Sequence, residues 1–397
     1  INPGKDMIMT GKVHSNSNIY FQPNGVNLTF QDAVTAVGGI YNDKKEGDTS
    51  KRSSGTYSFD AARDSGAPSM SLPIGTTDAT NAADAVHAIL EIPPSNEDKD
   101  SALGKQRYYN QSDLQILLSD TGLVIRTTAI ATNINATLAT NFIRTNVSFY
   151  NAREQKTVKG MEIDIAKFKK FSESDPILKN INMNVVYVAD TRLSNKGEQS
   201  GVSLINGQSL PGGVHGLTIA TPNPLYVKGD YNVTTNDTII SGANSRGTNN
   251  TDYTRPASLV ADAITVLSAN WSDANSTNSV DNRVATSTTV NAAILAGNVE
   301  TTEGNYSGGL ENFPRFLEKW GSDNVFTYNG SMVMLFKSKI AKKPWGGDNV
   351  YAPPTRHWAF DRNFLQGDKL PPATPKACQI YRRQWDVIPP KTTSFGG

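Results

Sequence analysis

The first 42 residues contain an internal repeat, and this repeat limits the folds open to the chain more than any other feature. Residues 11–20 and 32–41 match at an offset of about 21 residues. The matched positions are Val13 with Val34, Ile19 with Ile40, and Tyr20 with Tyr41. This offset suits one coil of a β-solenoid, where each strand stacks on its equivalent in the next coil. Residues 43–80 are rich in Ser, Gly, Asp and Thr, which predicts a long surface loop.

The repeat texture returns after Pro211-Gly212-Gly213. Small and branched apolar residues alternate in four stretches that recur about every 30 to 40 residues, at 217–220, 259–266, 289–296 and 328–336. Such alternation is typical of strands whose inward side chains form ladders inside a coil. The Asn- and Thr-rich intervals at 232–252 and 272–281 are expected to be loops.

Between the two repeat blocks the chain has longer, mixed elements. Residues 82–90 and 112–118 have helical spacing, with Ser112 as the expected N-cap of the second helix and Thr121-Gly122 as its end. An amphipathic helix is expected from Ile165 to Phe171. Strands are predicted at 123–125, 142–150, 161–165 and 185–188.

These patterns predict a mainly β protein: a right-handed parallel β-solenoid with an inserted α+β subdomain and a Pro/Trp-rich C-terminal cap. The expected divisions are N-terminal coils with a long loop at 1–80, the insertion at 81–210, C-terminal coils at 211–343, and the capping segment at 344–397. A cap is expected because an open end of a solenoid invites pairing with other strands.

Composition excludes several classes of protein. Lys plus Arg number 38 against 37 for Asp plus Glu, so the formal charge of +1 provides no field for binding nucleic acid. The single Cys378 forbids an intrachain disulfide, and the four histidines form no local ligand pair, which disfavours a metalloenzyme. No window approaches the roughly 18 apolar residues needed to span a bilayer.

Several strings resemble one family of surface proteins. Met9-Thr10-Gly11-Lys12-Val13-His14-Ser15-Asn16-Ser17-Asn18-Ile19-Tyr20 is similar to the G-x-V-H-S-N-G-x-I-Y opening of PilX-like pilus-assembly proteins, with Ser17 at a position that is usually Gly. Residues 106–114, 216–232 and 351–361 look like the same family. The matches therefore extend from the start to the end of the chain.

The resemblance implies a bacterial cell-envelope or extracellular protein whose full-length form begins with a prepilin-like apolar helix. Such a helix would be this chain's only contact with a membrane. The implied partners are other envelope or pilus proteins, or further copies of the chain. The family carries no agreed catalytic residues, so none is assigned here.

Two short motifs match the signature of aspartic proteases, in which two carboxylates share a proton. They are Asp120-Thr121-Gly122 and Asp64-Ser65-Gly66, preceded by Ser119 and Arg63 rather than by apolar strand residues. Three-residue strings arise easily in a chain rich in Gly, Ser and Thr. We therefore interpret both as turns or helix ends.

Parallel β-helices also serve as scaffolds for polysaccharide lyases and hydrolases. A catalytic set of that kind would come from Asp262, Lys228, Asp230 and Arg283, with Trp271 as a sugar platform. The repeat strands carry almost no charge, whereas acid–base chemistry needs two titratable groups within reach. We interpret these residues as solvated loop charges and assign no catalytic or cofactor-binding residue.

Calcium stays open as a structural ion, because aspartates lie in Asn/Gly-rich loops that offer oxygen ligands. These aspartates are Asp230, Asp237, Asp252, Asp273 and Asp281. No other cofactor is expected.

Other polar positions are given structural interpretations. The Asn-x-Ser/Thr sequons are interpreted as asparagines that bond to the backbone at turns rather than as glycosylation sites; they include Asn27, Asn135, Asn146, Asn232, Asn236, Asn270 and Asn329. The two lysine runs are interpreted as solvated faces; they are Lys167, Lys169 and Lys170, and Lys337, Lys339, Lys342 and Lys343. Cys378 is interpreted as a buried small hydrophobe rather than a nucleophile.

The first hypothesis is a non-enzymatic structural or adhesive protein of the cell envelope or extracellular space, associated with a pilus-like or secretion apparatus. The alternatives are a carbohydrate-active β-helix enzyme or glycan-binding module that contacts a surface glycan, and a self-assembling filament subunit.

Overall fold

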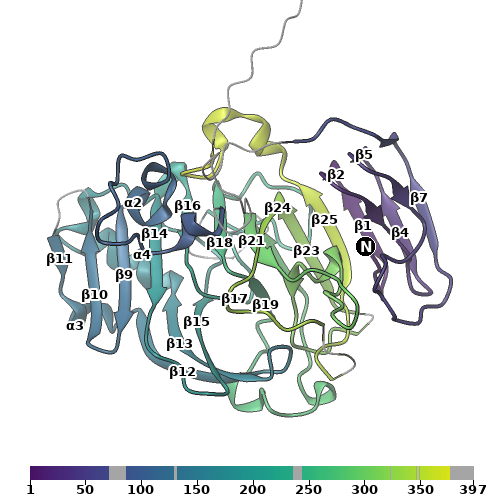
Figure 1. Ribbon diagram of the computed structural model, residues 1–397. Coiled ribbons are helices and arrows are strands. Elements are labelled where there is room, and N and C mark those ends of the chain that lie inside the picture. The colour runs from purple at the N-terminus through teal and green to yellow at the C-terminus, as the bar shows by residue number, and fades with distance from the viewer. Residues whose placement is uncertain are drawn as a thin grey trace, which may run out of the picture.

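The chain is mainly β, and most of its strands run parallel (Figure 1). A computed structural model describes residues 1–70, 86–128, 132–235, 244–321, 323–345, 347 and 349–375. No closed sheet is found in these ranges. Residues 376–397, with Cys378 and Trp385, lie outside them, so the interpretation of Cys378 stays a prediction.

The described residues form three large sheets and two small ones. The eight-stranded sheet has the order β11 (Thr132–Ile134), β10 (Gly122–Thr127), β9 (Leu114–Ser119), β14 (Val185–Asp190), β16 (Leu217–Ala220), β18 (Ala257–Ala261), β21 (Ala293–Asn298) and β24 (Met332–Lys337). One six-stranded sheet has the order β12 (Ile143–Asn151), β13 (Lys156–Asp164), β15 (Glu198–Ile205), β17 (Leu225–Lys228), β19 (Ile264–Leu267) and β22 (Pro314–Arg315). The other has the order β20 (Thr288–Asn291), β23 (Val325–Gly330), β25 (Thr355–Phe360), β1 (Met7–Thr10), β4 (Asn27–Phe30) and β7 (Thr56–Phe59). The small sheets are β2 (Val13–Ser15), β5 (Val34–Ala36) and β8 (Arg63–Ser65), and β3 (Ile19–Tyr20) with β6 (Ile40–Tyr41).

From β14 to β25, consecutive strands belong to different sheets, and each strand pairs within its sheet with strands that are not its neighbours in sequence. In the eight-stranded sheet, Ile219 lies opposite Leu259, and Leu259 lies opposite Ile294. All three side chains are buried in the main core. The four repeat stretches predicted after residue 211 are therefore neighbours, and three of them bend to supply strands to two sheets.

The N-terminal repeat has the register that the sequence predicts. Val13 pairs with Val34 in the β2–β5 ladder, and Ile19 pairs with Ile40 in the β3–β6 ladder. Tyr20 lies opposite Tyr41, and their rings stack with centroids 5.2 Å apart.

The long loop predicted at 43–80 is wrong for its central part. β7 and β8 lie there and pair with β4 and β5. The rings of Phe30 and Phe59 stack with centroids 4.8 Å apart, so β7 adds an aromatic contact to β4.

The middle segment contains short helices and two sets of antiparallel strands. Its described helices are α2 (Tyr108–Gln111), α3 (Ala136–Ala139) and α4 (Ile165–Ser174). The 3-10 turns in the described ranges of the chain are η1 (Ala88–Leu90), η2 (Gly104–Gln106), η3 (Leu178–Asn180), η4 (Gly213–His215), η5 (Asp273–Asn275), η6 (Val280–Asn282), η7 (Leu310–Asn312), η8 (Arg362–Leu365) and η9 (Gly367–Lys369). The amphipathic helix expected at 165–171 is confirmed as α4. The helix expected at 112–118 is wrong, because β9 lies there: it buries Leu114, Ile116 and Leu118 on one face and Gln115 on the other.

The spatial order of the segments differs from their order in sequence. β25 pairs with β23 on one side and with β1 on the other. The N-terminal strands therefore extend the stack beyond β25, and the 81–210 segment lies at the opposite end rather than between two blocks (Figure 1). The expectation that 344–397 caps an end is wrong for β25, because this strand lies in the middle of a sheet.

The interior also holds a buried ion pair. Glu154, in the turn after β12, accepts a hydrogen bond from the Arg315 guanidinium at 2.7 Å. Both side chains are no more than 2% exposed. Arg315 donates a second bond to the carbonyl of Ala341, and Glu154 accepts one from the amide of Lys343, so this pair ties β22 to the chain after β24.

Candidate functional site

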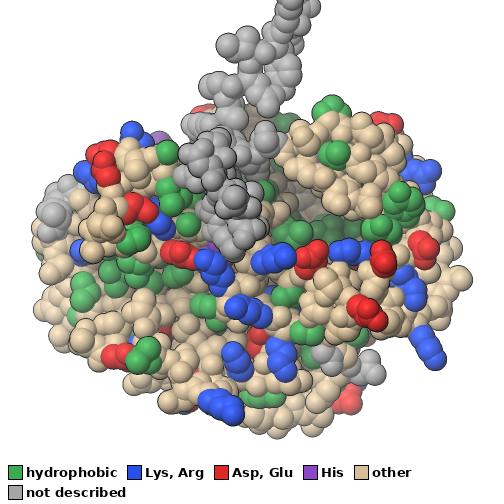
Figure 2. Space-filling model, viewed as in Figure 1, with side chains coloured by type: hydrophobic (Ala, Val, Ile, Leu, Met, Phe, Trp, Pro, Cys, Tyr) green, Lys and Arg blue, Asp and Glu red, His purple; other side chains and the backbone are tan. Residues whose placement is uncertain are grey.

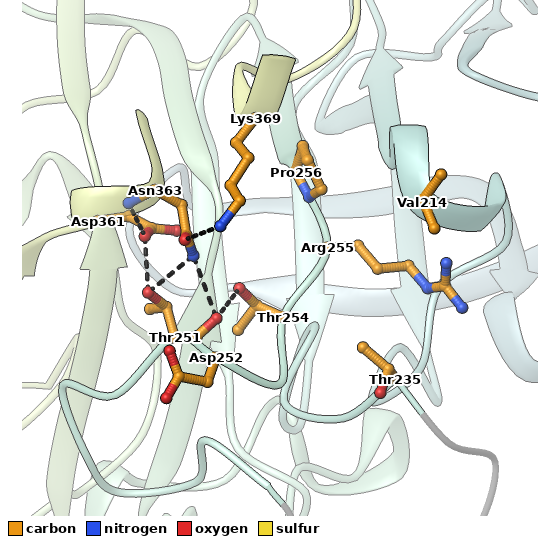
Figure 3. Close-up of a pocket in the computed structure, with 10 residues that line it drawn as sticks. All are labelled: Val214, Thr235, Thr251, Asp252, Thr254, Arg255, Pro256, Asp361, Asn363 and Lys369. Carbon is orange, nitrogen blue, oxygen red and sulfur yellow. Dashed lines mark hydrogen bonds between the residues drawn. The ribbon is translucent and has the colours of Figure 1, made fainter. Parts of the chain in front are cut away.

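A polar pocket of about 340 Å³ lies where the loop before β18 meets the segment after β25 (Figure 3). Its lining residues are Val214, Thr235, Thr251, Asp252, Thr254, Arg255, Pro256, Asp361, Asn363 and Lys369. Pro256 directly precedes β18, and Asp361 directly follows β25, so both walls are attached to strand ends.

Thr251 joins the two walls of the pocket. Its hydroxyl donates to the Asp361 carboxylate at 2.7 Å, and its carbonyl accepts from Thr254. The Asn363 side chain donates to both oxygens of Thr251, at 3.0 and 3.2 Å. Asp361 also accepts from the amide of Asn363 and so caps η8. Figure 3 shows this network on one side of the pocket, with Arg255 on the other.

A ladder of buried asparagines supports the loop that forms the first wall. Asn291 donates to the carbonyl of Asn232 at 2.9 Å, and Asn329 donates to the Asn291 side chain at 2.7 Å. Asn329 also donates to the carbonyl of Thr248, and Asn232 bonds to the backbone of Arg255. For the sequon Asn232, the predicted bonding of asparagine to the backbone is confirmed. Asn329 also bonds to the backbone, but it lies in β23 rather than at the expected turn. Both side chains are only 1% exposed.

The charges that line the pocket are balanced. Asp252 and Asp361 contribute two negative charges, and Arg255 and Lys369 two positive ones. Lys369 lies on the Asp361 side, where it bonds to Asn363, and Arg255 lies on the other side (Figure 3). Burial raises the pKa of Asp361, although hydrogen bonds from Thr251 and Asn363 oppose that shift. Because the Asp361 carboxylate bonds to a hydroxyl and an amide rather than to a second titratable group, the arrangement suits hydrogen bonding to a polar molecule better than proton transfer.

The structure uses Asp262 as a structural acceptor. Its carboxylate is fully buried and accepts from the backbone amides of Ile340 and Ala341 and from that of Lys339. The His87 ring contacts the Asp262 carboxylate with Nε2 at 3.2 Å, and it contacts the Glu91 carboxylate with Nδ1 at 2.9 Å. Asp262 therefore anchors the chain after β24 instead of facing solvent.

The other residues considered for carbohydrate chemistry do not converge. Asp230 accepts from the amide of Thr289 and pairs with Arg246. Trp271 is 4% exposed, donates to Asp273 and packs edge-on against Phe149, so no sugar can stack on it.

Lys228 and Arg283 instead lie near Glu318, a carboxyl that the sequence analysis missed. Glu318 is 1% exposed and accepts from the amide of Ser268 at 2.6 Å and from its hydroxyl at 2.7 Å. Burial raises its pKa to about 7, although the bonds from Ser268 and the charges of Lys228 and Arg283 oppose the shift. The position of Glu318 next to Lys319, between Phe316-Leu317 and Trp320, was the only local signal, and it is a weak one. Its burial leaves no access for a substrate.

The two protease-like motifs lie in different sheets. Asp120 is in the exposed turn between β9 and β10, near one end of the stack. Asp64 is in β8, the edge strand of the small sheet at the other end. The two carboxylates cannot share a proton, and the interpretation of the first motif as a turn is confirmed, although this turn joins two strands.

The proposed calcium aspartates are likewise dispersed. Asp273 bonds to Trp271, and Asp281 pairs with Lys319. Asp252 is in the pocket, whereas Asp237 lies outside the described residues. Within the described ranges, no group of three or more His, Cys, Asp or Glu side chains is placed to hold a metal ion.

One lysine prediction is wrong. Lys169 is 6% exposed and donates to the hydroxyl of Ser209, whereas the second run, from Lys337 to Lys343, is exposed as predicted.

In the part of the chain that the structure describes, no helix has the length and apolar character needed to cross a bilayer.

Comparison with known proteins provides no relative: no family model, no curated protein and no solved structure matches this chain.

Proposed function

We propose that this chain is a non-enzymatic structural or adhesive protein of the bacterial cell envelope or extracellular space, built as a right-handed parallel β-solenoid. The observation that carries this proposal is the in-register stacking of parallel strands from successive circuits, from β14 to β24 and from β25 to β7. Stacked coils make long, stiff scaffolds whose binding surfaces are loops.

The use of the buried acids supports a non-enzymatic role. Asp262 accepts several backbone bonds, Glu318 is enclosed, and Glu154 is paired with Arg315. A general acid needs both access to substrate and a second group within reach. These three carboxyls lack that access, and their bonds stabilise the fold.

The resemblance of residues 9–20 to PilX-like proteins supports an envelope location and a pilus-like or secretion apparatus as partner. The test is to tag the protein in its source bacterium, treat intact cells with protease, and identify cross-linked neighbours by mass spectrometry. We expect the tag to be cleaved on intact cells and the neighbours to be envelope or pilus proteins. A tag that is cleaved only after lysis contradicts the proposal.

The pocket favours glycan binding as a second candidate function. Hydroxyl, amide and charged side chains converge on a cavity large enough for about one sugar unit, which is the chemistry that recognises saccharide hydroxyls. The test is a glycan array with the wild-type protein and T251V, since this change removes the hydroxyl that joins the two walls. The matched control is T56V, at an exposed threonine of β7. Binding that T251V leaves unchanged contradicts the pocket as its site.

A further inference from the structure

The stack has a vacant strand position beside β25. β23, β25 and β1 are consecutive neighbours in one sheet. After β23 the chain turns a corner into β24, and after β1 it turns into β2. No such strand follows β25. The Asp361 amide still bonds to the carbonyl of Gly330, but the Asp361 side chain caps η8, and the chain continues as a 3-10 turn instead of a strand. β24 and β2 therefore each end a sheet, with no described strand between them.

The width of this gap is that of one strand. Gly330 lies opposite Phe360, and Ala359 lies opposite Thr10, so the three corners are aligned. Neighbouring strands are about 4.8 Å apart, which places β24 and β2 about 10 Å apart where they leave the corner. One strand between them would have normal spacing to both.

Both edges of the gap present backbone groups. In the parallel ladder with β21, the amides of Val333 and Leu335 point toward β21, and those of Met332 and Met334 point the other way. On the facing edge, Val13 donates to Ala33 and Ser15 accepts from Val37, so both bond toward β5. The amide and carbonyl of His14 then face the gap.

The floor of the gap is apolar and uncovered. Met334 lies opposite Ala296, and Met332 lies opposite Ile294, both of which are buried in the main core. Met334 belongs to the same inward face, yet it is 59% exposed. Figure 2 shows hydrophobic side chains in the hollow between the N-terminal strands and the rest of the molecule. The exposure of Met334 follows from the missing strand, because a strand in that position would cover it.

We propose that this gap, bounded by β24 and β2, is a docking site for an extended strand of a partner protein. The partner strand runs parallel to β24, bonds alternately to the two edges, and places apolar side chains on the floor beside Met334. An extended polypeptide is the occupant because no other ligand supplies donors and acceptors at strand spacing to both edges at once. Pairing with a sheet edge provides the affinity, and the apolar floor selects the side chains.

The first test is hydrogen exchange on the full chain. We expect the amides of Met334 and His14 to exchange fast, and those of Val333 and Leu335 to be protected. Protection of Met334 in the free protein contradicts the proposal, since the gap is then already filled. Sedimentation then shows whether a second copy of the chain fills the gap. Hydrogen exchange on a variant truncated after residue 375 shows whether the chain's own C-terminal residues fill it.

The second test uses a defined probe, a fluorescent peptide with the sequence of residues 292–298, which already forms the matching ladder as β21. We expect saturable binding that protects Met334, and binding weaker by about tenfold or more in M334P, which removes one edge donor. M334K provides a second variant if the proline disturbs folding. Y57P on β7, another open edge, is the matched control and retains binding. Absence of binding at millimolar peptide, or equal binding by M334P and wild type, overturns the proposal.

Discussion

Replacing Glu154 by Gln should destabilise the protein strongly, because it removes the charge that compensates the buried Arg315. Both side chains are at most 2% exposed, and their contact is 2.7 Å. Removing one partner of such a pair costs about 3 to 5 kcal/mol, since the remaining charge stays buried without compensation. With about 2.1 cal/mol/K of unfolding entropy per residue, a loss near 4 kcal/mol lowers the Tm by roughly 5 °C for a cooperative chain of this length.

The assay is urea denaturation followed by tryptophan fluorescence, with the unfolding slope compared between variants. The double variant E154Q/R315M removes both charges, so it should recover part of the lost stability. A loss below about 1 kcal/mol for E154Q, or a double variant no more stable than E154Q, would refute the argument that an uncompensated charge is the cause.

Three further changes test other parts of the structure. Because the pKa of Glu318 is raised to about 7, its protonated form stabilises the fold fully below pH 4.5. This stabilisation, about 3 kcal/mol of unfolding free energy, is lost as pH rises to about 7. E318Q should therefore flatten the dependence of unfolding free energy on pH between 4.5 and 7, and an unchanged slope contradicts this. Burial lowers the pKa of His87, but its bonds to two carboxylates raise it more. The stabilisation from His87 is then present below pH 6.5 and lost as pH rises through its raised pKa, so H87Q should destabilise at pH 5.5 and much less at pH 9. N291A should cost about 1 to 3 kcal/mol in denaturant, because it leaves buried asparagine partners unsatisfied.

The parts of the fold that the sequence predicts are those in which like residues stack on one another. Val13 and Val34 identify their own ladder, because identical side chains at a constant offset occupy equivalent positions. The strand β7 was missed because its offset differs: Phe59 lies opposite Phe30, 29 residues earlier instead of about 21, and the other three pairs of that ladder differ in residue type. The helix expected at 112–118 failed because the leucines of β9 fit both periods, and burial on both faces selects the strand.

The candidate site is less predictable, since it depends on contacts between distant loops. The bond from Thr251 to Asp361 joins residues 110 positions apart. No local motif marks either residue. Asp262 was noticed for its charge, but its role depends on amides that lie near it only after β24 has paired with β21. Local spacing therefore predicts strands and turns here, whereas side-chain roles follow from the stack as a whole.

The pairing of β1 with β25 also sets the order in which parts of the chain can fold during its synthesis on the ribosome. Met7 and Arg356, which are neighbours in that ladder, are separated by nearly the whole described chain. At 5 to 20 residues per second, β1 emerges roughly 20 to 70 s before its partner strand is synthesised. During that interval β1 has one edge unpaired, and the sheet that contains both strands is completed only when β25 is made.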